Sequence, residues 1–271
     1  MSDPSPNPPV VPGPVEGPDS EAPPHGANGG RTAVPNVPVA LILAAGVVAG
    51  LAAWLGGEAC RDLIKARRHV VNSRGIILYV VSHRDQDIAD ARNAGLAFAW
   101  LGACLGAALG AVGGLARRSG RAAMSAAGVG AVAGALACAA VSMVVLPLYT
   151  AYRNGHPDEA SRDLLFPLLV HAGIWSVAGA VGGLAFGLGL GRGERGVWTQ
   201  AALGGFVGAA IAAAAYELIG VAAFPGAATT QFISRTWPTR LMARLAVGIL
   251  AAAGVALAIA PPRERPVSPA P

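Results

Sequence analysis

Residues 102–114 read GACLGAALGAVGG, and this stretch decides the fold. Glycine recurs at every fourth position, so on an α-helix the glycines form one stripe without side chains: Gly102, Gly106, Gly110 and Gly114. Such a helix offers water no polar face, and each interior glycine costs about 1 kcal/mol relative to alanine. In a lipid bilayer, small residues at this spacing let a neighbouring helix approach closely. The stretch therefore predicts a membrane-spanning helix that packs through glycine.

The same stripe returns 77 residues later, at Gly179, Gly183, Gly187 and Gly191. The 77-residue shift also maps Arg118 onto Arg195 and Gly128 onto Gly205. Such self-similarity predicts a repeated helical hairpin. A weaker similarity links the first apolar segment to the third, so the simplest arrangement is three tandem two-helix units. Each unit has an even number of spans, which gives the copies the same orientation, unlike inverted transporter repeats.

The composition is that of a polytopic membrane protein. Of the 271 residues, 54% are hydrophobic and 13% are charged, with a mean hydropathy of +0.52, too apolar for an ordinary soluble domain. The net charge is +5, but the arginines gather at the ends of apolar segments. We therefore expect contact with lipid headgroups and no nucleic-acid partner.

Six apolar segments are long enough to cross about 30 Å of hydrocarbon. They cover residues 37–57, 94–115, 122–146, 166–190, 197–224 and 239–260. The predicted fold is all-α, a six-helix transmembrane bundle in the cell membrane. Residues 1–36 are rich in proline, and residues 261–271 follow a Pro-Pro pair, so both are predicted to be disordered tails. The arginine turns favour cytoplasmic N- and C-termini when the long first loop is left out of the count, and do not favour them when it is included.

Residues 58–93 form a polar insert between the first two spans. Over residues 58–71, apolar side chains share one helical face and basic ones the rest, which predicts either an amphipathic helix in the membrane interface or a solvated helix covering the end of the bundle. Residues 72–75 read as a turn. Residues 76–81 are apolar but too short to span, so we expect a short strand, a re-entrant edge or a plug. Residues 82–92 are charged and could begin a helix that continues into the membrane.

Three ionisable residues fall within spans, where such groups are functional candidates. These residues are His171, Glu217 and Arg244, and each lies about 8 to 10 Å below the same membrane face at helical rise. One hypothesis is a vestibule or proton path, with Glu217 as the carboxylate, Arg244 as its counter-ion and His171 as a titratable partner. The other is an interhelical salt bridge that fixes packing.

Signatures of catalysis and of cofactor or metal binding are otherwise missing from the sequence. There is no G-x-S-x-G, H-E-x-x-H or Walker-type motif. His156, Asp158 and Glu159 lack metal-ligand spacing and favour an exposed turn. Cys60, Cys104 and Cys138 are expected to be small packing residues. We therefore expect a non-enzymatic membrane protein that has a structural or assembly role and that can form a homo-oligomer. The alternative is a small-solute or ion transporter or channel that uses the three ionisable residues.

Overall fold

The structure is a computed structural model that describes residues 38–73, 76–156, 163–191, 195–224, 226–227 and 229–260. The chain divides into two units, residues 1–33 and residues 34–271, and all described residues belong to the second. The predicted tails, 1–36 and 261–271, lie outside the described residues.

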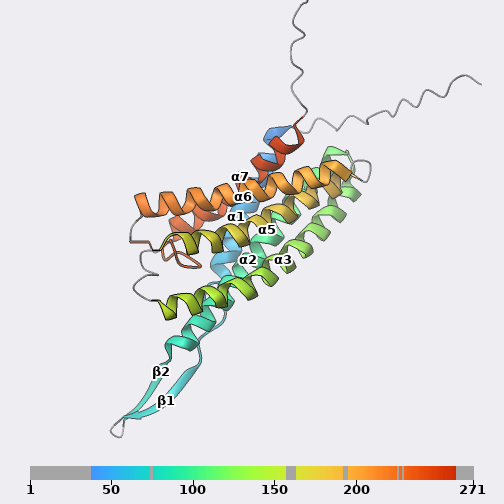
Figure 1. Cartoon of the computed structure of the whole chain (residues 1–271). Helices are drawn as coiled ribbons and strands as arrows, with labels where there is room; N and C mark the ends of the chain where they lie inside the picture. The colour runs from blue at the N-terminus through green and yellow to red at the C-terminus, as the bar shows by residue number, and fades with distance from the viewer. Residues whose placement is uncertain are drawn as a thin grey trace, which may run out of the picture. The chain divides into compact units, whose positions relative to one another are not determined.

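Within the described residues, the bundle is built from six helices that are each long and apolar enough to cross a membrane. They are α1 (Val39–Cys60), α2 (His83–Ala116), α3 (Gly120–Gly155), α5 (Leu165–Leu190), α6 (Arg195–Ala223) and α7 (Trp237–Ile259) (Figure 1). The prediction of an all-helical bundle with six spans is confirmed in this coarse form. We treat the chain as a multi-pass membrane protein.

Two helices are longer than the predicted spans. α2 begins at His83 because the Ser82 side chain accepts a hydrogen bond from the Asp85 amide, 3.1 Å away, and caps the helix. The charged segment 82–92 therefore continues into the membrane span, as the sequence suggested. α3 passes through Pro147 and continues to Gly155. Proline is tolerated inside transmembrane helices, and here it does not mark the end of the span.

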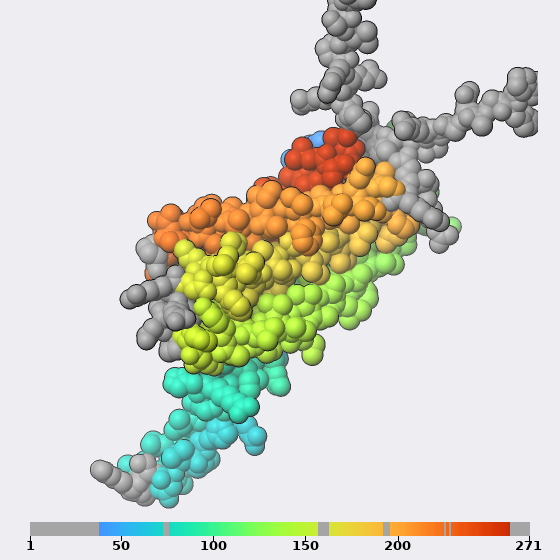
Figure 2. All heavy atoms as spheres, in the orientation of Figure 1, coloured from blue at the N-terminus to red at the C-terminus, as the bar shows by residue number. Residues whose placement is uncertain are grey.

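The insert contains a β-hairpin, so the predicted amphipathic helix over 58–71 is wrong. β1 (Arg68–Ser73) pairs antiparallel with β2 (Ile76–Val81), with Arg68 opposite Val81 and Ser73 opposite Ile76. The β-branched valines and isoleucines favour strands more than they favour a helix. Residues 76–81 thus form the expected short strand. The hairpin stands clear of the helices beyond the first turn of α2 (Figures 1 and 2), and every residue of β2 is exposed.

The helices form a ring in chain order. α1, α2, α3, α5, α6 and α7 each contact the next, α7 returns to α1, and α2 also contacts α5 across the centre. Leu101, Leu105, Leu109, Ile174 and Phe186 are fully buried between these helices. α2 and α5 therefore supply much of the core.

Glycines of α2 and α5 lie directly against the backbone of neighbouring helices. A Cβ atom added to Gly102, Gly106 or Gly110 would come closer than 3.0 Å to the backbone of α3. The same holds for Gly114 against α3, and for Gly179, Gly183 and Gly187 against α6. Gly191 differs. It ends α5 with a φ of 109° and lies against the Arg117 guanidinium, so it is a helix-terminating residue and makes no helix–helix contact of this kind.

The two glycine stripes meet their partner helices in different registers. Gly106 lies against Gly130, and its equivalent Gly183 lies against Ala201. A strict repetition of the first contact with a 77-residue shift would have placed residue 207 there. α6 is therefore displaced along α5 by about six residues, or roughly 9 Å at helical rise, relative to α3 along α2.

Candidate functional site

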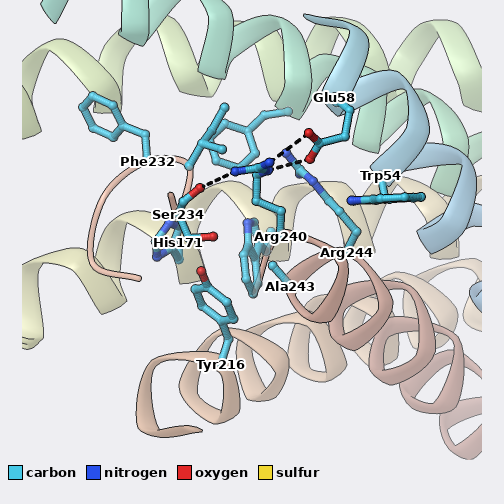
Figure 3. A pocket seen from close by; sticks show the side chains of 13 residues that line it. Trp54, Glu58, His171, Tyr216, Phe232, Ser234, Arg240, Ala243 and Arg244 are labelled. Atoms are coloured by element: carbon cyan, nitrogen blue, oxygen red, sulfur yellow. Dashed lines mark hydrogen bonds and ion pairs between the residues drawn. The ribbon is translucent and has the colours of Figure 1, made fainter. Parts of the chain in front are cut away.

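The predicted polar residues lie at the end of the bundle that carries the hairpin. The ends of α1, α3 and α6 meet the starts of α2, α5 and α7 here (Figure 1). Several of these helices bring polar side chains to one buried cavity, which Figure 3 shows from close by. We refer to this space, lined among others by Trp54, His171, Trp175 and Arg244, as the inner cavity.

His171 and Glu217 form a direct contact between α5 and α6. The His171 Nδ1 and Glu217 Oε1 atoms are 2.5 Å apart, and the residues are 2% and 4% exposed. The sequence predicted that equal depth would allow these two side chains to meet, and the structure places them together. One hydrogen bond therefore joins an imidazole of α5 to a carboxyl group of α6 in the interior of the bundle.

Aromatic rings hold the imidazole in place. The ring centroids of Trp175 and Tyr216 lie 5.2 and 5.8 Å from that of His171, and Tyr216 meets it edge-on at 89°. Trp175 and Tyr216 are 5.4 Å apart and both are buried. No sequence pattern predicted this aromatic cluster, because single aromatic residues in apolar spans are common.

Arg244 lines the same cavity but is not the counter-ion of Glu217. It is 7% exposed, no ion pair joins it to Glu217, and its Nη1 atom has no hydrogen-bond partner among the described residues. Its guanidinium carbon lies 5.0 Å from the centre of the Phe98 ring, a cation–π arrangement. The ion-pair role that the sequence predicted for Arg244 is therefore not observed.

The ion pair of this region joins two residues that the sequence analysis did not select. Arg240 binds Glu58 through both carboxylate oxygens, with Nε···Oε1 at 2.5 Å and Nη2···Oε2 at 2.9 Å. Its Nη1 atom donates to the backbone oxygens of Ser234 and Arg235, 2.9 and 2.8 Å away (Figure 3). These residues lay at the predicted boundaries of spans, where charges are common, and no spacing pattern distinguished them.

The segment between α6 and α7 folds over the inner cavity. Tyr149 of α3 donates a hydrogen bond to the Thr230 oxygen at 2.6 Å, and Thr239 donates to the Ser234 hydroxyl at 2.7 Å. Ser234 is 3% exposed although it belongs to a loop. The predicted loop 225–238 is therefore an ordered wall of the site over its described residues.

A second, larger cavity lies next to the first. This outer cavity has a volume of about 470 Å³, and charged side chains from several elements line it, including Arg61, Asp62, Asp87, Asp90 and Arg153. The inner cavity has a volume of about 20 Å³, which is enough for about one water molecule. The two share four lining residues: Phe232, Ile233, Ser234 and Arg240. The polar outer cavity at the bundle end therefore lies next to the buried charges of the inner cavity, and these four residues line both.

The described residues contain no group of three or more His, Cys, Asp or Glu side chains that could hold a metal ion. Asp158 and Glu159 lie outside the described residues. Of the three cysteines, Cys138 is buried and the other two are partly exposed. Comparison of the chain with protein-family models, curated proteins and solved structures finds no match.

Proposed function

We propose that this membrane protein binds a small polar solute at the inner cavity and passes it between the cavity and one face of the membrane, as a transporter or channel does. The observation that carries the proposal is the pair of cavities in series. The outer cavity is polar and large enough for hydrated solutes, and Phe232, Ile233, Ser234 and Arg240 line both this cavity and the charged inner cavity.

Buried charge at this depth supports the proposal. Ionisable residues inside membrane spans are expensive and usually mark a solute or ion pathway. Here Arg244 and Glu217 are each at least nine-tenths buried, and each has one polar atom without a partner among the described residues. A group that served packing alone would be expected to have its hydrogen bonds satisfied within the bundle.

The glycine contacts support a different role for the stripes than contact between copies of the chain. We propose that the four-residue spacing of glycine serves close packing within one bundle, because the glycines of α2 and α5 already lie against α3 and α6. The two-helix units remain part of this proposal, with a different register in each. An assembly role and a homo-oligomer stay predictions.

We also propose that both termini are cytoplasmic, so that the outer cavity opens on the opposite side of the membrane. Eight arginines belong to the two arginine turns and the flanking tails in the sequence, namely Arg31, Arg117, Arg118, Arg121, Arg192, Arg195, Arg263 and Arg265. Of these, Arg117 and Arg118 lie between α2 and α3 and Arg121 lies in the first turn of α3, at the end of the bundle away from the hairpin. Short segments rich in arginine usually stay in the cytoplasm.

The test is exchange of small solutes across proteoliposomes that contain the full chain. Uncharged, cationic and anionic labelled solutes of low mass are each assayed with the same unlabelled solute inside. Ala243 lines the inner cavity and is 8% exposed, so Ala243→Leu fills the cavity and is expected to abolish exchange. Ala133→Leu is the control, since Ala133 is exposed on the lipid-facing side of α3.

Exchange of at least one solute class, lost in Ala243→Leu and kept in Ala133→Leu, is the expected result. No exchange of any class by the unmodified chain, with the protein folded and inserted, would overturn the proposal. Equal exchange by both variants would place the pathway elsewhere.

A further inference from the structure

We infer that the inner cavity is a binding site for a small anion of about the size of chloride or formate. This inference rests on the proposed function and names the class of solute. It follows from the hydrogen-bonding groups around the cavity, from their charge and from its volume.

Three buried N–H donors around the inner cavity lack an acceptor among the described residues. They are the Nε1 atom of Trp54, the Nε1 atom of Trp175 and the Nη1 atom of Arg244. A buried donor without a partner is costly, and such groups are rare in folded proteins. All three groups can only donate, so the ligand that satisfies them must supply electron pairs. They come from α1, α5 and α7, and all three residues line the inner cavity.

The acceptors nearby are already occupied. Both Glu58 carboxylate oxygens bind Arg240, and Glu217 Oε1 faces His171. Glu217 Oε2 and the Ser142 hydroxyl also lack partners, but neither residue lines the inner cavity. The unsatisfied groups that line the cavity are therefore all donors.

The charge of the site also favours an anion as the ligand. Four ionisable residues line the inner cavity: Glu58, His171, Arg240 and Arg244. Glu58 binds Arg240 through both carboxylate oxygens, and no carboxylate among the described residues lies within ion-pair distance of the Arg244 guanidinium. A buried cation needs a counter-charge, because isolated charges are strongly disfavoured in an apolar medium.

The volume of the inner cavity limits which anions can bind there. A volume of about 20 Å³ admits one water-sized group. A halide fits this limit and formate, with three heavy atoms, exceeds it slightly, whereas a sugar acid such as gluconate is far too large. Water fits as well, but a water molecule brings no charge to balance Arg244.

The experiment measures the unfolding midpoint of the full chain in detergent while sodium chloride or sodium formate replaces sodium gluconate at constant ionic strength. Chloride and formate are separate arms, since either can provide the negative charge. Because a ligand that binds only the folded state raises the midpoint, we expect a saturable rise with at least one of them. In Arg244→Met, we expect the apparent affinity to fall by about 100-fold or more, as for the loss of a buried charge partner.

Two further variants separate binding from folding. Trp54→Phe and Trp175→Phe each remove one donor and keep the cation, and each should weaken the anion by roughly tenfold. Arg121→Met is the control, because Arg121 is exposed at the other end of the bundle. Its response should match that of the unmodified chain. If Arg244→Met does not fold, the two tryptophan variants carry the test.

Each outcome decides between the two proposals. A rise that is equal in every variant is a general salt effect and overturns the anion site. If neither anion raises the midpoint while an uncharged or cationic solute exchanges across proteoliposomes, the anion inference fails and the proposed function stands. Saturable binding that depends on Arg244, without exchange of any solute, shows a bound anion and overturns transport.

Discussion

The half of the bundle that ends in the arginine turns differs from the half that ends in the hairpin in how closely the helices approach. In the first half, a Cβ atom added to Gly106 or Gly183 would fall closer than 3.0 Å to a neighbouring backbone. In the second half, the nearest atoms to such a Cβ at Gly57 and Gly95 are 3.9 and 3.8 Å away, although a Cβ at Gly50 of α1 would still lie closer than 3.0 Å to the Arg244 backbone oxygen. Both cavities lie in this second half.

The difference shows that glycine alone does not bring helices together. Gly57 and Gly95 belong to the same spans as the close contacts, but there the nearest atoms belong to the side chains of Ala97, Arg244 and Ser142. Trp54, Phe98, Trp175 and Tyr216 stand between the helices at the hairpin end. Aromatic side chains separate the backbones, and polar groups fill part of the space that this creates. The same low-complexity helices thus form a closed half and an open half.

The largest expected effect comes from breaking the closed half. Gly106→Leu places a side chain against the Gly130 carbonyl, and since the obstructing atoms are backbone, the helices must separate. Overpacking of this kind should destabilise the protein by about 3 kcal/mol or more, and we expect little folded protein. Gly128→Leu is the matched control, because Gly128 is exposed and a Cβ there meets nothing within 4 Å. Monodispersity and thermal unfolding in detergent measure both, and equal stability of the two variants would contradict this account of the closed half.

A smaller effect is expected from the ion pair of the open half. Glu58→Gln leaves the Arg240 guanidinium without its carboxylate in a side chain that is 10% exposed. Loss of one partner of a buried pair is destabilising, but the Glu58 side chain is 30% exposed, so we expect about 2 kcal/mol. The Glu58→Gln, Arg240→Gln double variant should recover part of this loss. A double-mutant cycle by chemical unfolding measures the coupling, and strictly additive losses would show that the pair contributes nothing.

Within the open half, two residues should be energetically coupled when their side chains are in contact, and not merely because they lie at the same depth in the membrane. Glu217→Gln and His171→Phe should couple by about 1 kcal/mol, because a buried hydrogen bond joins the two side chains. Glu217→Gln and Arg244→Met should be additive to within about 0.5 kcal/mol, since no ion pair joins them. Unfolding of the single and double variants checks both cycles. A strong coupling of Glu217 with Arg244 would restore the ion pair that the sequence suggested.

The smallest effect is expected outside the spans, at Asp163. The Tyr152 hydroxyl and then the Leu165 amide donate to this carboxylate, each at 2.8 Å, and hold its pKa below the usual 3.8. A lowered folded pKa adds stability above the unfolded value, and that stability is lost as the pH falls through the folded pKa. The unfolding midpoints of the unmodified chain and of Asp163→Asn should therefore differ at pH 7 and converge below about pH 3.8. If the difference between the two unfolding midpoints grew on acidification, the predicted direction of the Asp163 pKa shift would be wrong.

The sequence predicted the number, order and type of the spans because a run of about 20 apolar residues reports directly on the thickness of the membrane. It did not predict the hairpin, since residues 58–71 fit a helical period while their valines favour a strand. It placed His171 and Glu217 at equal depth, which proved sufficient for contact. It could not place Arg244, because depth does not fix the rotation of a helix about its axis. No sequence pattern identified Trp54 and Phe98 as residues of the site, because their role depends on which helices are neighbours.

The length of α2 has a structural consequence. This single helix of 34 residues extends about 51 Å at 1.5 Å per residue, farther than the hydrocarbon is thick. At its start, Asp85 is hydrogen-bonded to His69 of the hairpin at 2.8 Å, and four turns later the Phe98 ring lies against the Arg244 guanidinium. One uninterrupted helix therefore joins the residue that contacts the hairpin to the residue that packs against the Arg244 guanidinium.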